Sequence, residues 1–297
     1  MPFDLKDYFT QKKTVIDTAL KAHWINDHHI RPKELLDAME YSLFAPGKRI
    51  RPVLVFASTQ TLNMPEEDVI PLAGALEMIH AFSLIHDDLP SMDNDDLRRG
   101  RPTNHKVFGE ALAILAGDAL LSHAFTVLSD LDTEKYPHEN IIDVIHHFAK
   151  ATGTCGMISG QVWDMQSENR IISLDELQNL HRHKTGALIT LAVTSPAVLK
   201  GAEPDVMDCL IRYSEAIGLC FQVVDDILDI EGDESLGKPI GSDQAKNKST
   251  YPALLGLDGA KKEAKRLLEV ALASLTSFDE RADPLRAIAR FIAERRN

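Results

Sequence analysis

The chain has 297 residues, a formal net charge of −13 and a pI of about 5.4. An acidic surface argues against a nucleic-acid backbone as the main partner, although basic side chains can still gather around a phosphorylated small molecule. Aromatic residues make up only 6% of the chain, and Ala and Leu are frequent, which favours helices over sheets.

The N-terminal residues, the apolar stretches and the cysteines together predict the location of the protein. Residues Met1 to Asp7 contain no apolar signal-peptide core, and no stretch reaches about 18 uncharged apolar residues, so we expect no membrane span. Cys155, Cys209 and Cys220 are odd in number and lack CxxC spacing, which argues against a disulfide framework or a zinc site. A cytoplasmic location is expected, because reduced cysteines fit that compartment.

In chain order, the first apolar run is Val53-Leu54-Val55-Phe56, which is compatible with a short strand but runs on into helix formers. Helical periodicity predicts helices over residues 71–86, 111–130, 139–161, 174–195, 205–230, 252–274 and 283–295. Gly and Pro breakers are local and open no long linker. One all-α domain over residues 1–297 is therefore the economical prediction.

An aspartate cluster is predicted within the helix at 217–230. Four polar side chains share one stripe of an ideal helix: Gln222, Asp225, Asp226 and Asp229. The rest of the circumference is apolar, so the carboxylates should face the interior or a cavity wall. They repel one another there and need cations, and oxygen ligands without His or Cys favour magnesium or manganese over zinc. The alternative is a surface helix with solvated aspartates.

Another acidic group lies earlier in the chain, after the helix at 71–86. It is the first aspartate cluster in chain order, and the one at 225–229 is the second. Asp87 and Asp88 end that helix, Pro90 breaks it, and Asp93 follows. The spacing does not match a calcium-binding EF-hand loop. Arg98 and Arg99 lie close by, and guanidinium groups beside carboxylates that hold magnesium suit a diphosphate. A surface ion-pair network is the alternative.

The two aspartate motifs resemble those of the trans-isoprenyl diphosphate synthases, and most of all the bacterial farnesyl diphosphate synthases. The likeness includes Asp87 to Gly100 and Asp225 to Asp229. Further matches occur in family order at Pro46 to Pro52, His80, Gly160-Gln161, Lys184-Thr185-Gly186, Gly237-Lys238 and Lys248-Ser249-Thr250. The resemblance implies an all-α homodimer of about ten or more helices per chain around a deep central cavity.

The resemblance also implies an activity, which is condensation of an allylic diphosphate with isopentenyl diphosphate. Three magnesium ions would lie between Asp87, Asp88 and Asp93 on one wall and Asp225, with Asp226 and Asp229, on the other. The implied allylic-site residues are Arg98, Lys184, Thr185, Gln222, Lys238 and Lys248. The implied isopentenyl-site residues are Lys48, Arg51, His80 and Arg99.

Each of these assignments has a plainer alternative. Lys48 and Arg51 suit an ordinary helix surface, and a lone His on an apolar helix is usually a core residue. Seven residues separate His80 from Asp87, which places both on one helix face two turns apart and supports a cavity wall. We interpret Gln161 as structural.

Product length is expected to depend on Phe82 and Ser83, which precede Asp87 by about 6–8 Å along the helix. By resemblance, an aromatic at this position and two extra residues in the first motif predict the C15 product, farnesyl diphosphate. Geranyl and geranylgeranyl diphosphate remain alternatives. A terpene cyclase would lack the isopentenyl set, and a regulatory subunit of a heteromeric prenyltransferase would be expected to have lost aspartates.

Overall fold

The computed structural model describes residues 3–26, 32–168, 170–231 and 249–295. Almost all regular structure is helical. The α-helices are α1 (Leu5–Asn26), α2 (Lys33–Leu43), α3 (Ile50–Thr61), α4 (Ile70–Asp87), α5 (Asn104–Phe108), α6 (Glu110–Ser129), α7 (His138–Thr152), α8 (Met157–Ser167), α9 (Leu174–His181), α10 (Ala187–Lys200), α11 (Pro204–Glu231), α13 (Tyr251–Ser274) and α14 (Asp283–Glu294). Short turns of 3₁₀-helix occur at η1 (Glu67–Val69) and η4 (Glu280–Ala282), and a π-helix at η2 (Arg182–Gly186).

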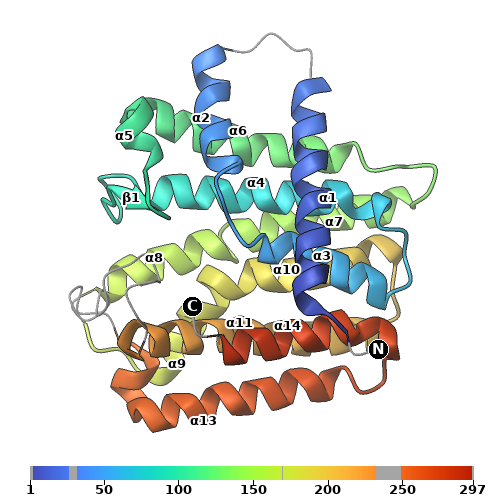
Figure 1. The fold of residues 1–297 in the computed structure, drawn as a ribbon, viewed down its shortest axis with the longest axis vertical. Coiled ribbons are helices and arrows are strands. Elements are labelled where there is room, and N and C mark those ends of the chain that lie inside the picture. The colour runs from blue at the N-terminus through green and yellow to red at the C-terminus, as the bar shows by residue number, and fades with distance from the viewer. Residues whose placement is uncertain (1–2, 27–31, 169, 232–248, 296–297) are drawn as a thin grey trace.

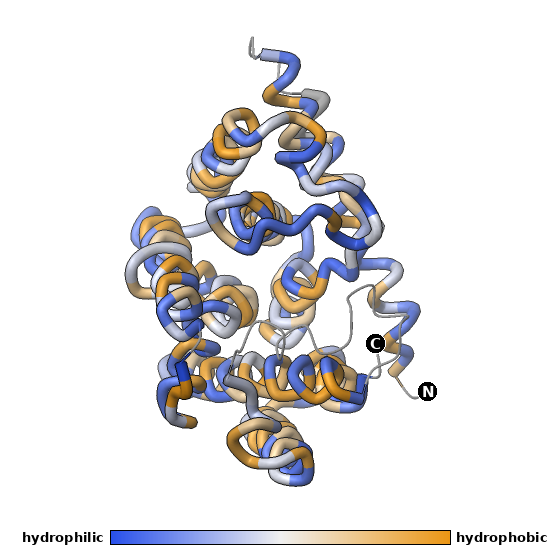
Figure 2. The backbone as a smooth tube through the Cα atoms, turned by 90° about the vertical axis from the view of Figure 1, so that its left-hand side faces the viewer, coloured by the Kyte–Doolittle hydropathy of each residue, from blue (hydrophilic) through white to orange (hydrophobic). Residues whose placement is uncertain are grey.

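The helices stack in layers around two long apolar helices. α4 packs against α6 and α3, while α11 packs against α13 and α10 (Figure 1). α10 connects the two groups through contacts with α3 and α7. Hydrophobic and hydrophilic residues alternate along most helical coils (Figure 2), as expected for helices that bury one face.

The structure corrects three details of the predicted elements. Residues 53–56 form no strand but lie in α3, where all four side chains are buried, because a helix enclosed by neighbours can be apolar on every side. The predicted helix 139–161 is two helices, since α7 ends at Thr152 before a Gly-containing turn. The predicted helix 174–195 consists of α9, the π-helix and α10.

In the part of the chain that the structure describes, the β-sheet consists of one hairpin with two strands of two residues each. Strands β1 (Leu97–Arg98) and β2 (Arg101–Pro102) pair antiparallel. The turn residues Arg99 and Gly100 both have positive φ, 53° and 74°. This is the backbone of a type I′ turn, whose twist matches that of paired strands. Because of the turn, Arg98 lies in a strand while Arg99 projects from the loop.

Candidate active site

The first aspartate cluster is folded back on the end of α4. The backbone N–H of Asp93 donates to the carbonyl of Asp87 at 2.9 Å, so the chain returns to the place where the helix ends. Among the described residues, the Asp87 carboxylate makes no hydrogen bond or ion pair. Burial raises the pKa of Asp87 to about 6; Lys184 opposes this shift and Asp93 adds to it. Asp87 is thus a half-buried carboxylate in need of a cation.

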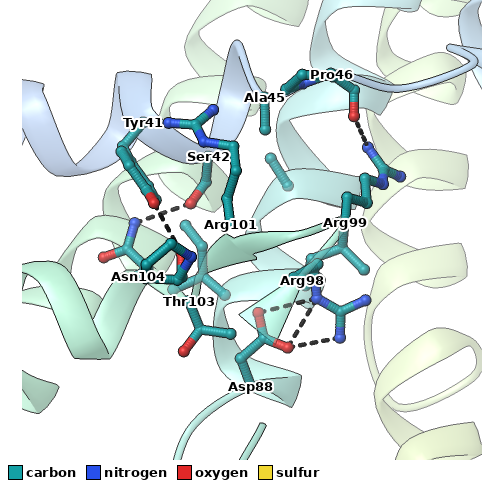
Figure 3. Close-up of a pocket in the computed structure, with 14 residues that line it drawn as sticks. Tyr41, Ser42, Ala45, Pro46, Asp88, Arg98, Arg99, Arg101, Thr103 and Asn104 are labelled. Atoms are coloured by element: carbon teal, nitrogen blue, oxygen red, sulfur yellow. Dashed lines mark hydrogen bonds and ion pairs between the residues drawn. The ribbon is translucent and has the colours of Figure 1, made fainter. Parts of the chain in front are cut away.

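Asp88 already has its cation. Arg98 Nε donates to both Asp88 oxygens at 2.7 and 2.9 Å, and Nη2 lies 2.6 Å from Oδ1 (Figure 3). Burial nevertheless raises the pKa of the Asp88 carboxyl, although Arg98 opposes the shift. The Asp88 side chain is almost fully buried, so this pair holds the hairpin against the end of α4.

A pocket opens beside this pair, between α2, α4 and the hairpin. Arg99 Nη1 donates to the carbonyl of Pro46 at 2.7 Å, and the Arg101 guanidinium lies 4.3 Å from the centre of the Tyr41 ring (Figure 3). The pocket is lined by Tyr41, Ser42, Ala45, Pro46, Ala81, Leu84, Ile85, Asp88, Arg98, Arg99, Arg101, Pro102, Thr103 and Asn104. Its arginines make one side of the candidate site strongly cationic.

Of the residues assigned to isopentenyl diphosphate, Lys48 precedes α3, Arg51 and His80 lie on α3 and α4, and Arg99 lies in the hairpin turn. Burial lowers the pKa of His80 well below its usual value, and Arg51 and Arg99 lower it further, so the imidazole is neutral at physiological pH. Its Nδ1 is buried and has no partner. Burial also lowers the pKa of Arg51, Arg99 and the more exposed Lys48. Close, desolvated cations of this kind favour an anionic ligand.

In the second cluster, Asp225 and Asp226 contact different parts of the protein. Asp225 Oδ1 accepts from Arg295 Nη2 at 2.9 Å, and the Arg295 guanidinium stacks 3.9 Å from the centre of the Phe221 ring. Asp226 is buried and accepts from the backbone N–H of Tyr251 at 2.8 Å, which caps the first turn of α13. The prediction that these carboxylates share one buried stripe differs from the structure in two respects: Asp226 turns toward α13, and Asp225 is 54% exposed.

Gln222 and Asp229 also lie on this helix and are partly buried. Among the described residues, no group of three or more His, Cys, Asp or Glu side chains is arranged to hold a metal ion by itself. In this conformation the described aspartates of the two clusters do not form one shared group of metal ligands.

Lys184 and Thr185 lie in the π-helix between α9 and α10. Single π-turns inside helices are often found at functional sites, because they redirect side chains and free backbone carbonyls. Lys184 Nζ donates to Asp164 Oδ2 at 2.5 Å. The positive charge of Lys184 also opposes the rise in the pKa of Asp87. A Cβ at Gly160 would collide with the backbone of Lys184, so glycine allows α8 to lie directly against the π-helix.

Phe82 and Ser83 lie on the buried side of α4. The Phe82 ring is 6% exposed and meets the His86 ring edge-on at 4.8 Å between centres. Ser83 Oγ donates to the carbonyl of His80. A Cβ at Gly117 would strike the His86 ring, which shows how closely α6 backs this part of α4. Lys238 and Lys248, also predicted at the site, lie outside the described residues.

The sequence resembles known proteins over almost its whole length. Residues 32–288 match the family described as Polyprenyl synthetase. The chain belongs to the polyprenyl synthetase family. A farnesyl diphosphate synthase of Geobacillus stearothermophilus is 46% identical to it over 292 residues, which are 98% of each chain. A geranylgeranyl diphosphate synthase of Cyanophora paradoxa is 45% identical over 99% of this chain and 98% of its own.

Solved structures agree with this assignment. A geranyltransferase of Legionella pneumophila has a TM-score of 0.87 and 31% identity, over 97% of this chain and 96% of its own. An FPP/GFPP synthase of Zymomonas mobilis has a TM-score of 0.82 and 35% identity, over 96% and 99%. The predicted all-α fold is confirmed as the isoprenoid synthase fold, and this polyprenyl synthetase is a prenyltransferase.

Three charged residues that pair next to the candidate site were not singled out by the sequence prediction: Arg49, Glu77 and Asp164. A weak signal was present for Glu77, because a charged residue stands one turn before His80 in an otherwise apolar helix. Asp164 follows Gly160 by one turn, toward Lys184. Their partners are distant in sequence, so only the folded chain shows the pairs.

Proposed function

We propose that this prenyltransferase makes farnesyl diphosphate by adding one isopentenyl diphosphate to geranyl diphosphate, or two in succession to dimethylallyl diphosphate. The observation that carries the proposal is the half-buried, unpaired Asp87 carboxylate, near enough to the charges of Lys184 and Arg98 for both to oppose the rise in its pKa. A separate cationic group, Arg51 and Arg99 around neutral His80, offers a second anion site. Two anion sites beside a carboxylate cluster suit two diphosphate substrates.

The carboxylates fit magnesium, with manganese as an alternative. Their donors are all oxygens, and Asp87 is a desolvated carboxylate without a cation of its own. Asp87, Asp88 and Asp93 on one wall and Asp225, Asp226 and Asp229 on the other would hold the three ions that the family resemblance implies. Magnesium bound there would neutralise the charge that builds up on the departing diphosphate.

Ionisation of the allylic diphosphate is the first chemical step in this proposal. The carbon–oxygen bond breaks, leaving an allylic cation and diphosphate. Arg98 and Lys184 stabilise the leaving oxygens, and the family resemblance adds Gln222, Lys238 and Lys248 to the allylic site. One preorganised contact of this kind is typically worth about 3 kcal/mol of barrier. In this proposal the Thr185 hydroxyl or the Lys184 carbonyl stabilises the cation.

Carbon–carbon bond formation is the second step. Lys48, Arg51, His80 and Arg99 hold isopentenyl diphosphate so that its double bond attacks the allylic cation. Neutral His80 acts as a hydrogen-bond partner and adds no charge. A proton then leaves the new chain, and the released diphosphate accepts it. Apolar walls exclude water, which would otherwise capture the cation.

Product length is proposed to be C15, with Phe82 as the floor of the cavity and Ser83 beside it. The support is the buried Phe82 ring, braced by His86 and closely backed by α6. A geranylgeranyl diphosphate synthase is the second candidate, because a relative of that name is 45% identical over nearly the whole chain. Geranyl diphosphate synthase is the third, and a regulatory subunit is the non-enzyme alternative.

We also propose a homodimer built on α6. By length and composition alone, α6 and the segment Glu67–Asp87 could each cross a membrane. In Glu67–Asp87, 67% of the apolar 18-residue stretch is buried inside the protein, as in a core helix. In α6, only 39% of the corresponding stretch is buried. Ile114 and Leu115 are 43% and 56% exposed, so a second copy of the chain would cover them. Analytical ultracentrifugation of the wild type and Leu115→Glu tests this.

The remaining proposals are a single domain over residues 1–297, a cytoplasmic location, no membrane span and no nucleic-acid partner. The three free cysteines support the cytoplasmic location, and the acidic charge argues against a nucleic-acid partner.

One assay tests the activity and its product. The purified protein is incubated with isopentenyl diphosphate, magnesium and either geranyl or dimethylallyl diphosphate, and the products are dephosphorylated and separated by chromatography. Farnesol as the main product supports the proposal, and geranylgeraniol supports the second candidate. No product with either allylic starter, in a folded protein, contradicts the catalytic proposal. Loss of product with a chelator and its return with magnesium tests the metal.

A further inference from the structure

Glu77 is a buried acid beside a cationic substrate site. It lies on α4, one turn before His80, and is 5% exposed. A diphosphate site has no obvious use for a carboxylate, because the acid repels the ligand. Buried charges persist when they are paired, so its partners indicate its role.

The direct partner of Glu77 is Arg49. Arg49 Nη1 lies 2.7 Å from Glu77 Oε1, and both side chains are buried. Arg49 is the residue before α3, with left-handed backbone (φ 52°), and its remaining donors reach Asp17 and the carbonyl of Leu43 at 2.9 and 2.8 Å. Each of the three guanidinium nitrogens therefore has an acceptor in the protein, and the side chain is buried, which favours a structural role over contact with a substrate.

This pair fixes the place where α3 begins relative to α4. Lys48 immediately precedes Arg49, and Arg51 lies in the first turn of α3. Moving Arg49 would move both cations, and its strained backbone leaves few alternatives. A single carboxylate on α4 thereby sets the position of two candidate ligands for isopentenyl diphosphate.

Glu77 also acts on the cations by charge. Burial lowers the pKa of Arg51 and Arg99, and in each case the Glu77 carboxylate is the largest opposing influence. Arg51 Nε is buried without a hydrogen-bond partner, so this guanidinium depends on nearby charge. Arg98, in the allylic group, is held instead by Asp88. The influence of Glu77 therefore falls on one substrate site.

We propose that Glu77 is a positioning residue for the isopentenyl diphosphate site, where it anchors Arg49 and holds Arg51 and Arg99 close together before the substrate arrives. The inference rests on the proposed condensing activity. Without the carboxylate, Arg51 and Arg99 repel each other and Arg49 loses its buried counter-ion. Part of the binding free energy of the diphosphate is then spent on ordering these arginine side chains.

The test is the Glu77→Gln variant, with KM measured for each substrate. We expect KM for isopentenyl diphosphate to rise about tenfold or more, while KM for geranyl diphosphate stays within about twofold. Glu77→Asp, which keeps the charge, should recover part of the loss. The matched control is Glu263→Gln, which breaks a Glu–Arg pair of 2.7 Å on α13 and should leave both constants within about twofold.

Three outcomes would overturn the inference. KM for isopentenyl diphosphate could fall or stay unchanged, which would mean that repulsion of the ligand outweighs positioning. Both constants could rise together, which would indicate general structural damage. Arg49→Lys covers the case in which Glu77→Gln does not fold: the same substrate split is expected, and its absence refutes the proposal. A wild type without condensing activity would instead contradict the proposed function, and calorimetric titration with isopentenyl diphosphate would still test Glu77.

Discussion

Asp87 should destabilise the metal-free protein at neutral pH, and Asp87→Asn should relieve this. Burial raises the pKa of the carboxyl from 3.8 to about 6 in the folded protein. Because the folded state holds the proton more tightly than the unfolded state, the free energy of unfolding falls as pH rises from about 4 to about 6. At 1.36 kcal/mol per pKa unit, the full loss above pH 7 is about 3 kcal/mol.

The gain from the amide should therefore depend on pH. Asn carries no charge at any pH, so the variant escapes the loss. We expect a gain of about 1.5 kcal/mol at pH 5 and about 3 kcal/mol at pH 7.5. For a chain of this size these correspond to rises in Tm of about 3 °C and about 6 °C. The same substitution should lower condensation at least about a hundredfold, because it weakens the cation site.

The measurement is thermal unfolding in a chelator at pH 5, 6 and 7.5, for the wild type and Asp87→Asn. Asp143→Asn is the control, because Asp143 is exposed on α7 and its loss should change Tm little at any pH. A variant no more stable than the wild type at pH 7.5 would refute the reasoning. A gain that does not shrink toward pH 5 would also refute it, since the effect would then not come from ionisation.

Three further substitutions test other parts of the site. Phe82→Ala should lengthen the product beyond C15, because it removes the buried ring that we propose as the floor of the cavity; chromatography that still gives C15 alone would contradict the floor role. Gly160→Ala should cost about 1–3 kcal/mol of stability and reduce turnover, because the new methyl group displaces the backbone of Lys184. Unchanged Tm and turnover would show that the contact is not tight. Arg295→Gln should lower the magnesium concentration that gives half-maximal activity several-fold, because the guanidinium no longer competes for Asp225. A higher magnesium requirement would mean that Arg295 supports the metal site.

Two controls sharpen these tests. Gly74→Ala is the match for Gly160→Ala, because a Cβ there would make only an ordinary contact of 3.4 Å with a Leu20 side chain. Chain length in Phe82→Ala should be compared at equal turnover, so that incomplete elongation is not mistaken for a retained floor.

Much of this protein could be predicted from the sequence because its signals are local. Helical periodicity located α4, α6, α11 and α13 to within a residue or two, since an apolar stripe of period 3.6 is a property of consecutive residues. The aspartate motifs and the paired arginines are also local, and their residue types alone indicate cations and phosphates. Family membership, which the comparisons confirm, followed from the same motifs.

Only the tertiary structure decided which of these side chains meet. The periodicity of the sequence does not predict that Arg98 pairs with Asp88 and not with Asp87. It also does not predict that Asp226 accepts a hydrogen bond from the first turn of α13. Glu77 reaches Arg49 across 28 residues of chain because α3 packs against α4. A pattern in sequence specifies a face of a helix. The partner on that face depends on how helices pack, and packing brings together residues that are far apart in the chain.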